Sequence, residues 1–193
     1  TIFFGFHGGG EWMGASINNN NGMMYITSNN IPTIGNVKKI NSNLSYNKYF
    51  SEFERLLDQD GYPGSKPPWG NLTALNLNNG KIRWQIPFGE YEELTKLGID
   101  LTGTENFGGA TGTAGDLIFA TGTLDKKIRG FNSQNGKEVW SYKMDFVGSG
   151  PPSIYAINGE QYIVVASTGS YSLSKAYSVD FGNILYCFKL KNE

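Results

Sequence analysis

The amino-acid sequence predicts an all-β fold built from short four-stranded sheets, with one helical insertion. Three observations support this prediction. The chain of 193 residues contains 26 glycines and 14% aromatic residues, a composition typical of many short strands joined by tight turns. One segment holds four strand-like runs with no room for a helix, and its closing pattern also occurs earlier in the chain. We interpret the fold as a partial β-propeller of about three four-stranded blades.

The segment 106–142 defines the blade. Turn residues separate its β-rich runs at 114–116, 123–125 and 134–136, which is a hairpin signal. The strands are expected at 107–113, 117–121, 127–132 and 137–142. Four strands in roughly 37 residues fit one propeller blade.

The closing pattern of this blade recurs at 72–84. Both copies contain a strand, then the pattern Asn-x-x-Asn-Gly-Lys, and then a Trp three residues after the Lys. Gly80 and Gly136 are 56 positions apart, as are Trp84 and Trp140, and a shared offset is the mark of a repeat. Glycine supplies the positive φ of a hairpin turn, and the Trp on the outermost strand can pack against a neighbouring blade. The alternative is two unrelated hairpins that both end in Trp.

Composition excludes several classes of protein. The formal net charge is −1 and charged residues make up only 17% of the chain, so no basic surface for nucleic acid is expected. No apolar run reaches the length of a membrane span, and no signal peptide is visible. Since the chain begins at Thr1 in a strand-like run, we expect a fragment of a longer protein.

Cysteine and histidine each occur once. Cys187 lies in an apolar run, so we expect a buried strand residue and not a reactive thiol. One Cys and one His are too few for a Cys/His metal site. His7 precedes three glycines and is interpreted as a loop residue; a catalytic base is the alternative, although no Ser or Asp partner is visible nearby.

The first blade is predicted at about 11–88 and is interrupted by an insertion at 29–70. Its strands are expected near 11–17, 23–27, 72–77 and 82–88. Within the insertion, the apolar spacing of 49–57 predicts a one-sided helix that ends at Asp60-Gly61. An insertion of this length normally carries function or contacts a partner.

Two further segments complete the chain. Residues 89–105 form a polar connection, with one helical turn expected at 92–97, into the second blade at 107–144. The third blade is predicted at 152–190, with strands near 151–156, 161–166 and 183–190 and a Gly/Ser loop before the last. Since no Gly-Lys-x-x-Trp follows, its fourth strand is expected to be missing; an open edge of this kind favours pairing with another segment.

Several stretches together resemble a known family. They are GGGEWMGA at 8–15, the repeat at 72–84, TGTENFGG at 102–109, TLDKKIRGF at 123–131 and GEQYIVV at 159–165. They resemble the C-terminal part of the pyrroloquinoline quinone (PQQ) dependent dehydrogenases, which are eight-bladed quinoproteins. The similarity is greatest to the membrane-type glucose and sugar dehydrogenase branch, and it covers nearly the whole chain except part of 29–66.

This resemblance implies a chemistry. In the family, PQQ lies on the propeller axis, a calcium ion acts as Lewis acid, and an aspartate takes the proton of the substrate hydroxyl. The expected reaction is oxidation of a sugar or alcohol, with electrons passed to ubiquinone or a cytochrome, in a periplasmic protein associated with the inner membrane. The calcium ligands and the catalytic aspartate belong to earlier blades, and no match for them is found in this chain.

The resemblance also implies cofactor-binding residues. Glu11 and Trp12 fall at one blade entrance, and Asn106, Phe107 and Gly108 fall at the next. Three of them have a structural alternative: a core position for Trp12, a salt bridge for Glu11, and close packing of inner strands for Gly108.

The sequence leaves three functions open. The first is part of a quinoprotein dehydrogenase, which alone is expected to be inactive. The second is a non-catalytic PQQ-like propeller, similar to the scaffold lipoproteins of outer-membrane assembly; the long insertion disfavours it. The third is a carbohydrate-binding or hydrolytic propeller, for which no paired carboxylates at blade entrances are found.

Overall fold

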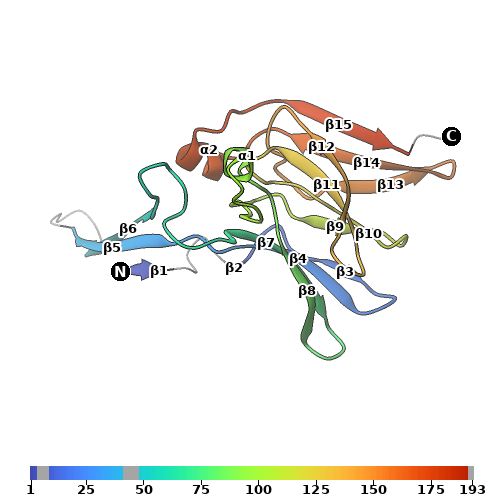
Figure 1. Cartoon of the computed structure of the whole chain (residues 1–193), viewed down its shortest axis with the longest axis horizontal. Helices are drawn as coiled ribbons and strands as arrows, with labels where there is room; N and C mark the ends of the chain where they lie inside the picture. Colours follow the sequence, from blue (N-terminus) through green and yellow to red (C-terminus); the bar gives the residue numbers. More distant parts are fainter. Residues whose placement is uncertain (4–8, 41–47, 191–193) are drawn as a thin grey trace.

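The computed structural model describes residues 1–3, 9–40 and 48–190, and its strands form four antiparallel sheets (Figure 1). We call three of them the first, second and third sheets in chain order. The fourth contains the two strands of the insertion, β5 (Thr33–Lys39) and β6 (Tyr49–Arg55), together with a short N-terminal strand; we call the pair of β5 and β6 the inserted hairpin. Among the described ranges, no helix is long and apolar enough to cross a membrane.

The first sheet has the order β2-β4-β7-β8, and β3 also pairs with β4. Its strands are β2 (Gly9–Gly10), β3 (Ser16–Asn18), β4 (Met23–Asn29), β7 (Gly70–Asn76) and β8 (Lys81–Pro87). The strands predicted near 23–27, 72–77 and 82–88 are confirmed. The strand predicted near 11–17 is largely wrong, because only its end belongs to β3 and residues 11–15 lie in the irregular segment between β2 and β3.

The second sheet has the order β12-β11-β10-β9. Its strands are β9 (Ala110–Gly112), β10 (Leu117–Ala120), β11 (Lys127–Asn132) and β12 (Glu138–Lys143). All four were predicted, but β9 is shorter than expected. The reason is the positive φ of Gly109 (78°), which interrupts the extended backbone between Asn106 and β9.

The third sheet has three strands in the order β13-β14-β15, as predicted. They are β13 (Ser153–Ile157), β14 (Glu160–Ser167) and β15 (Ile184–Lys189). Alternate residues of β15 are exposed, and Cys187 is among them. The expectation that Cys187 is buried is therefore wrong, because an apolar run does not show which of its alternate residues face solvent.

The helix predicted at 49–57 is also wrong. This segment forms β6 (Tyr49–Arg55), which pairs with β5 (Thr33–Lys39), and β5 in turn pairs with β1 (Ile2–Phe3). Tyr and Phe favour strands, and β5 offers an unbroken partner from Lys39↔Tyr49 to Thr33↔Arg55. The apolar spacing suited a helix, but long-range pairing with β5 decides the structure.

Two helices lie in the connections. The helical turn predicted at 92–97 is confirmed as α1 (Glu92–Lys96). α2 (Tyr171–Tyr177) was not predicted, because its segment was interpreted as a Gly/Ser loop; only Leu173 of this helix is buried. In Figure 1, both helices lie on the side of the inserted hairpin.

The sheets pack against one another through two hydrophobic clusters. The larger joins the first and second sheets and includes Tyr25, Leu72, Ile118 and Phe131, while the smaller joins the second and third sheets. Trp84 of β8 packs on the second sheet, where its indole N–H donates to the Ser133 carbonyl (2.9 Å). The predicted packing of this Trp on a neighbouring blade is confirmed.

Because consecutive strands run antiparallel, their connections alternate between two ends of each sheet. At the turn end lie the tight turns 19–22, 77–80, 113–116, 133–137 and 158–159. At the loop end lie the insertion, both helices and the long segments that precede β9 and β13. Of the residues implied in cofactor binding, Glu11 and Trp12 directly follow β2, which pairs with the loop end of β4, and Asn106, Phe107 and Gly108 precede β9, so all five lie toward the loop end.

Candidate functional site

The loop end brings together three side chains from distant parts of the sequence. Asn29, the last residue of β4, lies between Glu11 and Asn106. Its Nδ2 donates to Glu11 Oε1 (2.6 Å) and to the Asn106 carbonyl oxygen (2.9 Å). Its Oδ1 accepts from the backbone N–H of Asn106 (2.9 Å) and from Asn106 Nδ2 (2.8 Å). Asn29 therefore fixes the distance between the entrances of the first and second sheets.

Asn106 is fully buried. Besides its contacts with Asn29, it forms an isolated β-bridge with Thr123, and its Nδ2 lies 3.3 Å from the Ser28 carbonyl oxygen. Its Oδ1 is also buried and has no donor among the described residues. Asn106 thus acts as a fixed support beneath the entrance, with one acceptor left unsatisfied.

Glu11 is the titratable group of this cluster. Its side chain is buried, and burial is the main reason that its pKa rises from about 4.5 to about 7; the negative charge of Glu105 adds to the shift, and the hydrogen bond from Asn29 opposes it. No salt bridge to Glu11 forms among the described residues. A carboxyl group with this pKa can hold or release a proton near neutral pH.

The other three implied residues differ in exposure. Trp12 is 82% exposed, so it lies outside the hydrophobic core of this chain. Phe107, which follows Asn106 in the sequence, is half-buried. Gly108 is buried, and a Cβ there would lie 2.2 Å from the Thr121 carbonyl oxygen, so close packing against the end of β10 requires glycine.

A second cluster surrounds Glu105, whose side chain is fully buried. Arg55, from the end of β6, donates from Nε to Glu105 Oε2 (2.5 Å) and from Nη2 to Oε1 (2.6 Å). The hydroxyl of Tyr177, at the end of α2, donates to Oε2 (3.0 Å). The pKa of Tyr177 is raised, mainly by burial and by the Glu105 charge.

A cleft of about 620 Å³ opens at the loop end beside this cluster. Its walls come from the insertion, α1, the β10–β11 loop and α2, and they include Tyr62, Tyr91, Lys143 and Tyr177. Tyr91 packs edge-on against Trp69 and Tyr62, at 5.5 Å and 5.0 Å between ring centroids. The insertion therefore rests on the connection between the first and second sheets, through an aromatic contact with Tyr91 as well as through Arg55 and Glu105.

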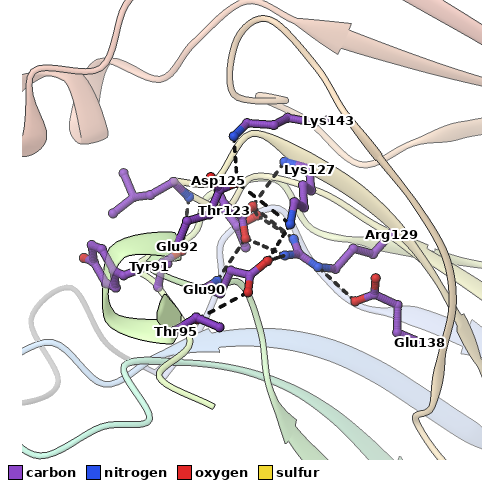
Figure 2. Close-up of polar contacts among 12 residues, drawn as sticks. Glu90, Tyr91, Glu92, Thr95, Thr123, Asp125, Lys127, Arg129, Glu138 and Lys143 are labelled. Atoms are coloured by element: carbon purple, nitrogen blue, oxygen red, sulfur yellow. Dashed lines mark hydrogen bonds and ion pairs between the residues drawn. The ribbon is translucent and has the colours of Figure 1, made fainter. Parts of the chain in front are cut away.

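A network of charges holds α1 on the second sheet (Figure 2). Asp125 is buried and bonds Arg129 through both oxygens, at 3.0 and 2.5 Å. The same carboxylate accepts from the backbone N–H of Glu90 (2.9 Å), and Lys127 Nζ donates to the Glu90 side chain (2.5 Å). The Arg129 guanidinium and hydrogen bonds hold the pKa of Asp125 below its usual value despite burial. This network fixes the connection that carries Glu105 and Asn106.

Sequence reasoning identified the entrances but missed the residues that join them. Asn29 and Arg55 lie in or beside an insertion with no visible motif, and Tyr177 lies in an unpredicted helix. The only signal for these three residues was their position, because the segments that carry them lie at the loop end. His7 lies outside the described residues. Within the described ranges, no group of three His, Cys, Asp or Glu side chains is placed to hold a metal ion.

Comparison with known proteins gives a consistent result. Residues 1–163 match the family model for the β-propeller domain of PQQ-dependent glucose, ethanol and alcohol dehydrogenases. The chain is 30% identical over 168 residues to a quinate/shikimate dehydrogenase (quinone) of Acinetobacter baylyi, covering 83% of this chain and 19% of that protein. It is 30% identical over 146 residues to quinoprotein glucose dehydrogenase A of Acinetobacter calcoaceticus, covering 74% and 18%. The chain thus spans about a fifth of the length of these curated relatives.

Solved structures show the same fold. A europium-containing methanol dehydrogenase superimposes with a TM-score of 0.65 at 19% identity, covering 91% of this chain and 32% of that one. The quinohemoprotein alcohol dehydrogenase of Comamonas testosteroni gives a TM-score of 0.57 at 22% identity, covering 82% and 22%. The prediction of a partial β-propeller is confirmed.

Proposed function

Because the chain belongs to the PQQ-dependent dehydrogenase β-propeller family, we propose that it is the C-terminal part of an enzyme that oxidises a sugar or alcohol hydroxyl group. The family match over 163 residues carries this proposal. The relatives include glucose, glycerol and quinate dehydrogenases, and all are named for oxidation of hydroxyl-bearing compounds. No observation favours the non-catalytic scaffold.

The chemical groups of the loop-end residues suit the functional groups of PQQ. PQQ is a planar quinone with three carboxylates and a pyrrole N–H. The exposed ring of Trp12 offers a flat apolar face for such a plane. The raised pKa of Glu11 allows a protonated carboxyl beside an anionic ligand, where an ionised one would repel it. The buried Oδ1 of Asn106 has no donor among the described residues, which leaves an acceptor beneath the entrance.

We therefore assign roles to the five residues. Trp12, Phe107 and Glu11 contact the cofactor, and Asn106 and Gly108 support that contact from beneath. When bound, PQQ accepts the hydride equivalent of the substrate. Glu11 holds or releases a proton at its carboxyl, and Asn29 orients that carboxyl through Oε1.

Other parts of the proposal rest on the family. The chain forms one piece of a single propeller domain over 1–193, with blades at about 11–88, 107–144 and 152–190. A calcium ion beside PQQ is held by residues of other blades. Electrons pass to a quinone or a cytochrome, and the parent protein works in the periplasm at the inner membrane. We propose no nucleic-acid partner.

Reconstitution tests the proposal. The full-length apoprotein that contains this chain, supplied with PQQ and calcium, is expected to reduce a dye with sugars or alcohols, and the 193-residue chain alone is expected not to do so. Full-length protein that folds but shows no PQQ-dependent dye reduction with any hydroxyl compound would contradict the dehydrogenase assignment. Sustained turnover by the chain alone would contradict the assignment of the metal and proton-accepting groups to other blades.

A further inference from the structure

The inserted hairpin is fastened to the site by an ion pair that is almost free of solvent. The Arg55 side chain is 11% exposed and that of Glu105 is 0% exposed. Both carboxylate oxygens of Glu105 accept from Arg55, in a bidentate arrangement. Arg55 also lies over the Tyr177 ring, with Cζ 5.8 Å from its centroid.

This ion pair joins three separate pieces of the chain. Arg55 comes from the insertion, 50 positions before Glu105, and Tyr177 comes from the third sheet's helix, 72 positions after it. Glu105 itself immediately precedes Asn106, which Asn29 holds from both sides of its peptide backbone. A shift of Glu105 is therefore transmitted directly to the entrance.

Stability alone is a weak reason for such a pair. Removing two charges from water costs about as much as their attraction returns, and apolar residues of the same volume often serve as well. An apolar pair in place of Arg55 and Glu105 would lack the fixed negative charge that Glu105 places at the entrance. The negative charge of Glu105 raises the pKa of Glu11, and the hydrogen bond from the Asn29 amide lowers it.

Building on the proposed function, we infer that Arg55 and Glu105 are positioning residues of the cofactor site: the pair docks the inserted hairpin at the loop end and fixes a carboxylate beside Asn106 that acts on Glu11. The insertion is then a wall of the site and not a separate appendage. Its docking is completed by Tyr62 and Trp69, which are stacked at 6.2 Å and pack against Tyr91. Glu105 affects the reaction through Glu11 and Asn106 and need not touch the cofactor.

The test uses the full-length protein with the substitutions Arg55→Met, Glu105→Gln and the two combined. The matched control is Lys38→Met with Glu52→Gln, which removes an exposed ion pair from the same hairpin. Hydrogen exchange of the β6 amides reports docking without any need for cofactor. PQQ affinity and the pH midpoint of kcat/KM report the effect on Glu11.

Each single variant is expected to speed exchange of β6 amides by about tenfold or more, because it leaves one buried charge unpaired. Glu105→Gln is expected to move the Glu11 midpoint to lower pH, since loss of a neighbouring negative charge favours the ionised carboxyl. The double variant is expected to regain β6 protection, with no unpaired charge, but to keep the lowered midpoint. A pair that only stabilised the fold would not be expected to restore β6 protection while the Glu11 midpoint stays lowered.

The inference is overturned if β6 exchange and the Glu11 midpoint in all three variants equal those of the Lys38/Glu52 control. If a single variant does not fold, the β6 exchange and the Glu11 midpoint are measured in the double variant and in Tyr177→Phe instead. Tyr177→Phe removes only one hydrogen bond to Glu105. Failure of the proposed function has a different signature. In that case the wild-type protein binds no PQQ, while the exchange experiment still reports whether the ion pair docks the hairpin.

Discussion

The two interfaces between the sheets use the same sequence signal with different results. At the first interface, Trp84 reaches the 133–137 turn of the second sheet, donates to the Ser133 carbonyl, and lies against Gly136, where a Cβ would come within 2.9 Å of its ring. At the second interface, Trp140 packs edge-on against Phe188 at 5.3 Å but remains 37% exposed. Among the described residues, no turn of the third sheet receives the Trp140 ring in the way that the 133–137 turn receives the Trp84 ring.

The loop end shows a similar difference. At the first interface, the connection between sheets is held by the buried Asp125 carboxylate through the Glu90 N–H. At the second, the corresponding connection is held by the Ser167 hydroxyl, which accepts from the Phe146 N–H (3.1 Å) and donates to the Phe146 carbonyl (2.8 Å). One interface is therefore fastened by charge and the other by a neutral hydroxyl group.

The difference shows that a Gly-x-x-x-Trp repeat specifies only half of an interface. The Trp supplies a large apolar surface and an N–H donor, but the neighbouring sheet must supply the turn that receives them. The first interface is complete in this sense, so we expect it to carry most of the stability between the sheets.

The largest effect is expected for Asp125→Ala. Removing this carboxylate leaves the Arg129 guanidinium buried without its main partner, which costs about 3–5 kcal/mol. Asp145→Ala is the control at the second interface, because Asp145 is exposed and its carboxylate accepts a hydrogen bond from the Tyr186 hydroxyl; its cost should be below about 1 kcal/mol. Urea unfolding of the chain measures both. Equal losses would contradict the importance of charge at the first interface.

Next in size is the comparison of the two tryptophans. Trp84→Ala is expected to lower the free energy of unfolding by about 3 kcal/mol and Trp140→Ala by about 1 kcal/mol, because Trp84 is partly buried against the core and hydrogen-bonded, whereas Trp140 is 37% exposed. The same urea experiment gives both values. A greater loss for Trp140 would reverse the ranking of the interfaces.

Ser167→Ala should have a smaller effect. The side chain is fully buried, and its removal leaves the N–H and carbonyl of Phe146 without their partner. The expected loss is about 1–2 kcal/mol. Ser172→Ala, on the half-buried side of α2, is a control for the loss of a hydroxyl and should change stability by less than about 0.5 kcal/mol.

An effect of similar size is expected from pH at the first interface. Because the pKa of Glu11 is raised to about 7, the folded chain binds a proton more tightly than the unfolded chain. Stability is therefore expected to fall as pH rises from about 4.5 to about 7, by about 1–2 kcal/mol, because partial contact with solvent reduces the full linkage value. Glu11→Gln should remove this segment of the pH dependence. A profile that stays unchanged in the variant would show that another group titrates.

Local signals in the sequence predicted much of the fold. Asn-Gly and Gly-Lys turns set the strands on either side of them, and β11 was predicted to the residue. The segment 49–57 failed because its apolar spacing suits one helix face, while its partner β5 lies beyond any local window. The α2 segment failed for a related reason, since only Leu173 is buried and a single apolar anchor gives no period.

The site was predictable only in part. The entrance motifs placed Glu11 and Asn106 correctly at the loop end, but nothing in either motif indicates that Asn29 lies between them. The pairing of Glu105 with Arg55 depends on how the insertion folds back. Side chains that meet across 50 or more positions leave no local pattern, so their contacts require the structure.

The most direct test of the central claim, that PQQ binds at the loop end against Trp12 and Glu11, is calorimetric titration of PQQ into the full-length apoprotein. Trp12→Ala is expected to weaken binding about tenfold, through loss of its ring face, and Glu11→Ala should weaken it as well. Ile17→Ala, an exposed apolar residue at the turn end of the same inner strand, is expected to leave the Kd unchanged. Equal Kd values for wild type and all three variants would contradict the claim.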